Sequence, residues 1–230
     1  MVNDQIVNIK SGETFEKVFL NESVNLHFVQ EAGSHVKIHV LNIPVDNSIT
    51  RNFDISKQSC PSEAKNNIVV EQRGENCSTE IYALAYLHGE EKLTTETHVT
   101  HAVGGGTSNQ LIKFVLADNS RGRFVGDLKI APDAQKTEAH QTNRNLLLSD
   151  DAEMRTQPQL EIYADDVKAT HGASTGQLDD SALFYMQQRG IGKQKARQLL
   201  VNAFMKEIVE TISDEKIKSN VLTFFEEETF

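Results

Sequence analysis

The chain has 230 residues, of which 23 are lysine or arginine and 33 are aspartate or glutamate, so its formal net charge is −10. This length predicts one large domain, or one domain with a small appendage. The negative charge argues against a nucleic-acid-binding protein, which normally presents a basic face. No run of apolar residues approaches the roughly 18–20 that a transmembrane helix needs.

The N-terminus and the cysteines indicate the cellular compartment. Residues 1–5 lack the basic and apolar regions of a secretory signal peptide. The two cysteines, Cys60 and Cys77, are too few for a disulfide framework. We therefore expect a soluble cytoplasmic protein that binds neither nucleic acid nor membrane.

From about residue 15 to residue 175, apolar and polar residues alternate with the period of two that is typical of β-strands. Glycine, asparagine, aspartate and serine separate the runs and supply turn chemistry. The predicted strands lie at 24–28, 36–40, 68–70, 81–87, 111–116, 124–125, 146–148 and 160–163. Residues 42–67, which are rich in asparagine and serine, are predicted to form a long loop.

No helical period interrupts these strands, which disfavours alternating βαβ units. The remaining folds are a sandwich, a barrel and a β-solenoid, because polar-out alternation fits all three. No strict short repeat decides in favour of a solenoid.

The pattern changes near residue 178. Asp179 is a suitable N-cap for a first helix that stops at Gly190. A second helix follows Gly192, and Ser213 is a candidate cap for a third. The predicted buried stripe of the second helix comprises Ala196, Leu199, Leu200, Ala203, Phe204 and Ile208. We therefore divide the chain into a β core domain, residues 1–177, and a C-terminal helical domain, residues 178–230.

Patterns that would specify metal or nucleotide chemistry are weak. His98 and His101 are three residues apart in a predicted strand, so they point to opposite faces. His35 and His39 share a face but lie about 13 Å apart along a strand. The glycines at 104–106 lack the lysine and the following helix of a phosphate-binding loop, so we predict a tight turn there.

Several ordered segments resemble the SufB/SufD family, the scaffold proteins of the SUF iron–sulfur cluster assembly system. The segments are TSNQ at 107–110, AQKT at 134–137, QTNRNLLLS at 141–149, TQPQLEI at 156–162, ADDVK at 164–168, HGA at 171–173, LFY at 183–185, RGI at 189–191 and AR at 196–197. Their number and order make the match more specific than any single motif. The HGA segment is similar to the SufD branch, whereas the SufB branch usually carries HEA there.

The resemblance implies a right-handed parallel β-helix, or β-solenoid, followed by a C-terminal helical domain. It also implies a non-catalytic subunit that pairs with a SufB-type scaffold through the β-helix and receives a SufC-type ATPase on its helices. That partner would hydrolyse the ATP, in keeping with the missing phosphate loop. No permanent cofactor is expected, and a transient iron–sulfur cluster would form near the junction of the two scaffolds.

The same resemblance supplies candidate site residues. His171 is the candidate cluster ligand, since neutral imidazole binds iron. Many SufD proteins resemble CSHGA at this site, and Ala169 stands where that cysteine would be. Lys168, Ala169 and His171 form the candidate scaffold interface. The candidate ATPase-docking residues are Leu183, Phe184, Tyr185, Arg189, Ile191, Arg197, Leu200 and Phe204.

Two other functions stay open. A β-helix carbohydrate lyase or hydrolase would need carboxylates that converge on one face, and Asp127, Glu138 and Asp165 are the candidates. The other alternative is a SufB-like scaffold that works as a homodimer without a separate partner scaffold.

Overall fold

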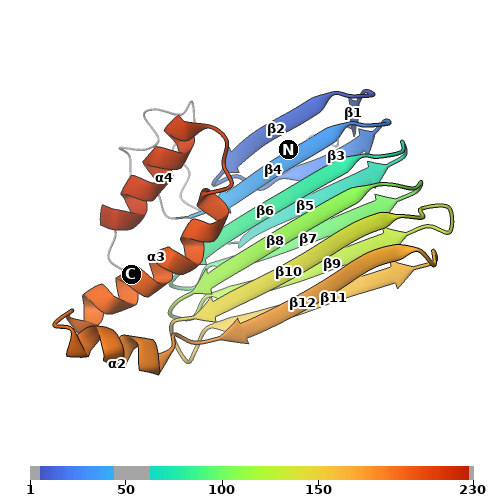
Figure 1. Cartoon of the computed structure of the whole chain (residues 1–230). Coiled ribbons are helices and arrows are strands. Elements are labelled where there is room, and N and C mark those ends of the chain that lie inside the picture. Colours follow the sequence, from blue (N-terminus) through green and yellow to red (C-terminus); the bar gives the residue numbers. More distant parts are fainter. Residues whose placement is uncertain (1–5, 44–62, 228–230) are drawn as a thin grey trace.

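The computed structural model describes residues 6–43 and 63–227. Its strands belong to two six-stranded parallel sheets, which we call sheet A and sheet B (Figure 1). Sheet A contains β1 (Ile6–Ile9), β3 (Asn25–Gln30), β5 (Glu63–Gln72), β7 (Lys92–His101), β9 (Arg121–Ile130) and β11 (Glu153–Ile162). Sheet B contains β2 (Thr14–Leu20), β4 (His35–Asn42), β6 (Ser78–Leu87), β8 (Thr107–Leu116), β10 (Thr137–Leu147) and β12 (Val167–Gly176).

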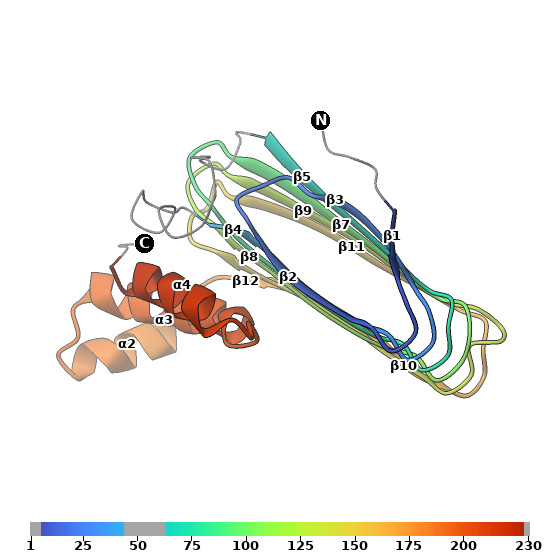
Figure 2. The same ribbon diagram turned by 90° about the horizontal axis from the view of Figure 1, so that it is seen from above.

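Successive strands alternate between the two sheets, so the chain winds into stacked coils (Figure 2). Neighbouring coils are in register: Lys92 of β7 lies beside Arg121 of β9, and Ser78 of β6 lies beside Thr107 of β8. The fold is a parallel β-solenoid with C-terminal helices. This confirms the fold class implied by the resemblance and decides among the three folds that the strand pattern left open.

The core of the solenoid lies between the two sheets. Every second side chain of a strand points inward, as the period of two predicts. In β9, for example, Phe124 and Leu128 are buried, whereas Arg121 and Arg123 are exposed. Each large apolar side chain that is fully buried contributes about 1.5–3 kcal/mol to folding, and the interior is filled by such residues, including Phe28, Ile38, Ile68, Ile81 and Phe114.

Two coils approach each other closely at Gly74, in the turn between β5 and β6. The Gly74 N–H donates to the carbonyl of Gln30 at 3.0 Å, and a Cβ on Gly74 would lie 1.9 Å from the backbone nitrogen of Ala32. We expect Gly74→Ala to lower the free energy of unfolding by about 3 kcal/mol or more, because a backbone atom cannot move aside. Urea denaturation measures this loss. Gly176→Ala is the control, since its Cβ would meet nothing within 4 Å, and a loss of similar size there would contradict the explanation.

The loop prediction for 42–67 is wrong at both of its ends, and Asn42 is the last residue of β4. Residues 63–67 begin β5, and Ala64 and Asn66 point into the core. The asparagine-rich composition concealed this strand because Asn66 is a buried polar residue whose amide donates to Asn42 at 2.8 Å. Residues 44–62 of the predicted loop, with Cys60, lie outside the described residues.

Three helices follow β12: α2 (Asp180–Gln188), α3 (Lys193–Val209) and α4 (Glu215–Glu227). The predicted N-cap of α2 is confirmed, since the Asp179 carboxylate accepts a bond from the Ser181 N–H at 2.9 Å. Gly190 follows the end of α2 with φ +81°, as expected for a helix stop. The cap of α4 is Asp214 rather than Ser213, because the Asp214 carboxylate accepts the N–H groups of Lys216 and Ile217.

The helices pack on the outer face of sheet B, where α3 contacts β6 and β8. Val201, Met205 and Ile208 share a second buried cluster with Leu84 and Val115. None of the described helices covers the outer face of sheet A (Figure 2). The division of the chain into two domains stays a prediction.

The predicted stripe of α3 is partly wrong. Ala196 and Ile208 are buried, but Leu199 is 39% exposed and Ala203 is exposed. Apolar residues lie on two sides of this helix, so their spacing alone did not show which side meets the sheet. The sheet-facing side is set by Val201 and Met205, which the stripe omitted.

Candidate functional site

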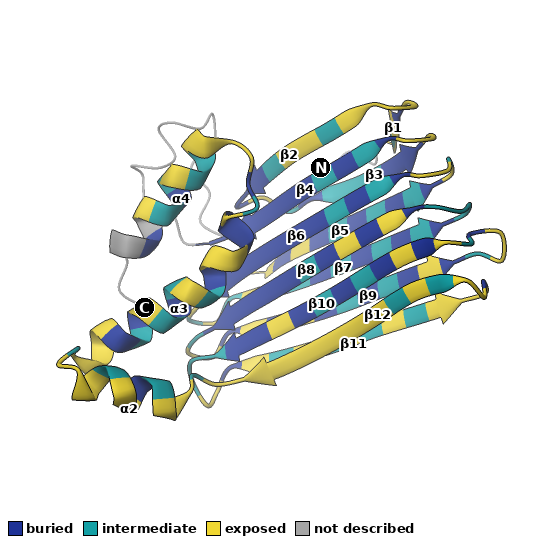
Figure 3. Cartoon of the chain, in the orientation of Figure 1, coloured by how far each residue is buried: buried dark blue, intermediate teal, exposed yellow. Residues whose placement is uncertain are grey.

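Strands β11 and β12 form one end of the solenoid. Within the described residues, β11 pairs only with β9 and β12 only with β10, so both ten-residue strands have a free edge. Figure 3 shows β12 exposed along most of its length. Ile162 would face the core in an interior coil but is 42% exposed here. Free edges of this length are templates for pairing with another chain.

His171 lies in the middle of this open end. It pairs in register with Gln141 of β10, whose side chain is buried and points inward. His171 therefore points toward the interior side of the last coil, where no further described coil covers it. Ala169 lies on the same face beside Ala139, whereas Lys168 lies on the outer face beside Glu138. The structure thus separates the three candidate interface residues between two faces of β12.

No group of three or more His, Cys, Asp or Glu side chains in the described residues is arranged to hold a metal ion. The neighbouring His140 is held by the hydroxyl of Thr170, 2.8 Å from its Nδ1. His98 and His101 point to opposite faces as predicted: His98 contacts Asp127 on the outside, and His101 contacts Ser108 in the core. Within residues 6–43 and 63–227, His171 therefore belongs to no such metal-binding group.

The three carboxylates considered for glycoside chemistry do not converge. Asp127 lies on the outer face of sheet A, and Glu138 lies on the outer face of sheet B. Asp165 lies in the bend between β11 and β12 rather than on a strand. Glycosidases need two carboxyl groups within about 5–10 Å across one bond, and this geometry does not supply them.

A buried lysine holds α3 against sheet B. The side chain of Lys113 on β8 is 1% exposed, and its ammonium group forms an ion pair with Glu207 and donates to the carbonyl of Phe204 at 2.6 Å. It also lies 4.4 Å from the centre of the Phe204 ring. Burial lowers the pKa of Lys113, and the contact with Lys113 lowers the pKa of Glu207. Arg144 of β10 adds a second cation at 3.1 Å from Glu207.

Two fully buried histidines titrate below their usual range. Burial lowers the pKa of His101 to about 4. Burial also lowers the pKa of His39 to about 4, with a smaller contribution from the Lys37 charge and an opposing one from Glu16. His39 stacks on Tyr82 and contacts the Thr211 hydroxyl at 2.9 Å, so it lies under the helices.

Because of these two histidines, we expect the free energy of unfolding to fall with pH already above the range in which carboxylates protonate. Both bind protons more weakly in the folded chain than in the unfolded chain, so their stabilisation is complete above pH 6.5 and is lost as the pH falls toward 4. We expect a loss of about 2 kcal/mol per histidine between pH 7.5 and pH 5, measured by urea denaturation. His101→Gln should remove about half of this pH dependence. An unchanged pH dependence would contradict the assignment.

Comparison with known proteins places the chain in a family. Residues 23–204 match the family model described as SUF system FeS cluster assembly, SufBD core domain. This chain belongs to the SufBD family. It is 42% identical over 158 residues to the iron–sulfur cluster assembly protein SufD of Escherichia coli. The aligned region covers 69% of this chain and 37% of that protein.

Other relatives are similar to this SufBD core. A SufBD family protein of Synechocystis is 38% identical over 151 residues, covering 65% of this chain and 33% of that protein. SufD of Plasmodium falciparum is 29% identical over 213 residues, covering 90% of this chain and 14% of that protein. The matched part of the chain thus spans between 14% and 37% of the length of these relatives.

The candidate docking residues of this SufBD core divide into two groups. Phe184 and Tyr185 are 62% and 59% exposed on α2, and Arg189 lies over the Tyr185 ring. The others contribute to packing inside the chain or are half-buried: Leu183 is buried, Phe204 contacts Lys113, Arg197 donates to the carbonyl of Leu148, and Ile191 and Leu200 are half-buried. Leu199 adds an exposed apolar side chain that the sequence assigned to the core.

The sequence analysis did not predict a buried ion pair at Lys113. The lysine is a single cation within the apolar run at 111–116, and nothing near it in the sequence indicates a partner. No described helix of this SufBD core is long and apolar enough to cross a membrane.

Proposed function

We propose that this chain is a non-catalytic scaffold subunit for iron–sulfur cluster assembly, which binds a SufB-type scaffold at its open end and a SufC-type ATPase on its helices. The observation that carries the proposal is the pair of free ten-residue edges on β11 and β12, with His171 on the inward face of β12. Membership of the SufBD family supplies the biological setting.

The open end suits a second solenoid. A partner that continued the coils would satisfy the free backbone groups of both edges and cover Leu160, Ile162 and Ala169, which are now partly exposed. A second copy of this chain could pair through the same edges. Co-expression with a SufB-type scaffold from the same genome distinguishes the heterodimer from the homodimer. If the SufB-type scaffold is the partner, the purified complex should contain both scaffolds rather than two copies of this chain.

The exposed side of α2 suits the ATPase. Phe184 and Tyr185 are large apolar side chains that the fold leaves in solvent, and aromatic residues of this kind dominate binding energies at interfaces. Arg189 beside Tyr185 adds a cation to the same patch.

Deletion of the helices would not test this assignment, because α3 packs on sheet B and shares a buried cluster with Leu84 and Val115. A Phe184→Ala, Tyr185→Ala double variant is a cleaner test, and we expect at least about a tenfold loss of affinity for a SufC-type ATPase in a binding titration. Tyr163→Ala is the matched control, since Tyr163 is an aromatic residue of similar exposure, 58%, at the open end. Unchanged binding by the double variant would show that the ATPase docks elsewhere.

The nascent cluster would be cargo held at the junction between the two scaffolds. His171 is the side chain of this chain that we assign to contact it, with further ligands from the partner, and Ala169 supplies no ligand. His171→Ala should lower cluster maturation in cells while the complex with the SufB-type scaffold still copurifies. Normal maturation would leave His171 without a ligand role.

A further inference from the structure

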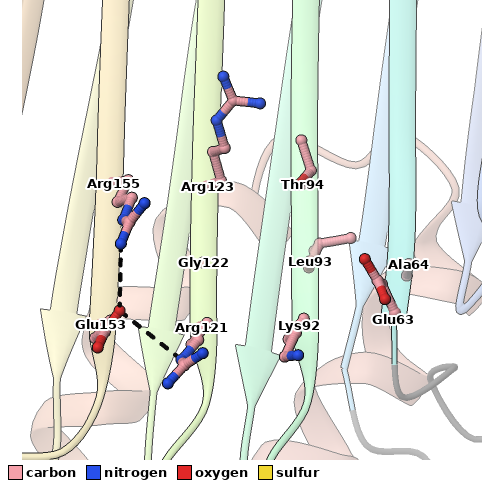
Figure 4. Close-up of a pocket in the computed structure, with 10 residues that line it drawn as sticks. All are labelled: Glu63, Ala64, Lys92, Leu93, Thr94, Arg121, Gly122, Arg123, Glu153 and Arg155. Atoms are coloured by element: carbon pink, nitrogen blue, oxygen red, sulfur yellow. Dashed lines mark ion pairs between the residues drawn. The ribbon is translucent and has the colours of Figure 1, made fainter.

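A group of basic side chains lies on the outer face of sheet A, which none of the described helices covers. Lys92, Arg121, Arg123 and Arg155 line an open groove of about 220 Å³ at the N-terminal ends of β7, β9 and β11 (Figure 4). The ten residues that line the groove include only two acidic ones, Glu63 and Glu153. The lining therefore carries more cations than carboxylates, although the net charge of the chain is −10. The adjoining hollow, which shares Lys92 and Arg121, adds the carboxylates of Glu90, Glu91 and Asp151.

The register places two arginines beside each other, since Arg123 pairs with Arg155. In the preceding row Lys92 and Arg121 also lie side by side, but Glu63 pairs with Lys92 and Glu153 pairs with Arg121. Like charges directly opposite on neighbouring strands destabilise a sheet. An anion bound between Arg123 and Arg155 would relieve this repulsion.

The carboxylates of the chain only partly neutralise these cations. Glu153 lies between Arg121 and Arg155 at 3.8 and 3.9 Å, and Arg123 is directed away from it (Figure 4). Arg123 lies 3.8 Å from Glu96, which also pairs with Lys65 at 2.9 Å. These arginine contacts are longer than charge-assisted hydrogen bonds, which measure about 2.7–2.9 Å. Within the described residues Lys92 has no side-chain partner.

The type of cation defines the ligand. The groove is open and shares four lining residues with a larger adjoining hollow, so its volume does not limit the size of the ligand. Arginine forks match the oxygen pairs of phosphate groups. We propose that this groove binds a multivalent oxyanion, a phosphate or diphosphate group, either free or at the end of a nucleotide. This inference does not depend on the proposed scaffold function.

Titration calorimetry of the full chain with pyrophosphate and with ADP tests the proposal. We expect saturable binding of at least one of them in the millimolar range or tighter, and at least about a tenfold loss in an Arg123→Gln, Arg155→Gln double variant. Binding of pyrophosphate alone indicates the free anion, whereas tighter binding of ADP indicates the nucleotide.

Two controls separate a site from general charge effects. Lys10→Gln, Lys216→Gln changes the net charge equally at exposed remote positions and should leave binding within about twofold of the parent chain. Glu153→Gln removes a competing carboxylate and should tighten binding. No saturable binding of either probe up to about 10 mM, or equal losses in the two double variants, would overturn the proposal.

Discussion

Lysines placed at Ile162 and Ala173 should abolish binding of a SufB-type scaffold. Both positions point toward the open end, since Ile162 pairs with buried Ile130 and Ala173 pairs with buried Asn143. A partner strand that covered this end would bury two unpaired ammonium groups, which is costly. Natural edge strands carry lysines for the same reason, because they prevent pairing with other chains. We expect the Ile162→Lys, Ala173→Lys variant to lose at least about 100-fold in affinity, measured by a binding titration.

A matched variant carries the same charges on the same strands. Gln159→Lys, Ser174→Lys places its lysines at positions that alternate with the inward-facing ones, so their side chains point to the outer faces. We expect this variant to bind within about threefold of the parent chain. Equal losses in the two variants would show that the open end is not the interface.

Glu207→Ala should destabilise the docking of α3 on sheet B by about 2–3 kcal/mol. Without Glu207, the partners that the described residues still offer the buried ammonium of Lys113 are the carbonyl and the ring of Phe204. The value is below the range for a fully buried pair because Glu207 itself is 47% exposed. The free energy of unfolding from urea denaturation measures the loss, and Glu210→Ala, which removes an exposed pair with Lys218, should change it little.

Lys113→Met tests whether the penalty comes from the unpaired charge. Methionine keeps much of the side-chain length and carries no charge, so the Lys113→Met, Glu207→Ala double variant should recover most of the stability that Glu207→Ala loses. A double variant as unstable as Glu207→Ala, or less stable, would show that Lys113 contributes by packing rather than by charge pairing.

Local features of the fold followed from the sequence. The period of two placed His98 and His101 on opposite faces, and Asp179 and Gly190 marked the ends of α2. These features depend on neighbouring residues, and hydrophobic period and capping chemistry describe such short-range effects.

Features that depend on register across coils did not follow from the sequence. His98 contacts Asp127, 29 residues later, and nothing near either residue specifies that partner. For the same reason the strand pattern did not separate a solenoid from a sandwich, and the resemblance supplied that choice. His171 also came from the resemblance, whereas its exposure at the open end depends on where the stack of coils stops.

Buried polar residues account for the other differences. Lys113 and Asn66 are buried because residues distant in sequence accept their hydrogen bonds. Local polarity placed Asn66 in a loop and gave no prediction for Lys113. The groove of Arg121, Arg123 and Arg155 likewise exists only because β9 and β11 pair in register.

The most direct test of the account is to co-express this chain with a SufB-type scaffold and a SufC-type ATPase from the same genome and to measure the mass of the purified assembly by light scattering. The account predicts one complex that contains all three proteins, that loses the scaffold with Ile162→Lys, Ala173→Lys and that loses the ATPase with Phe184→Ala, Tyr185→Ala. Recovery of this chain free of both partners would contradict it.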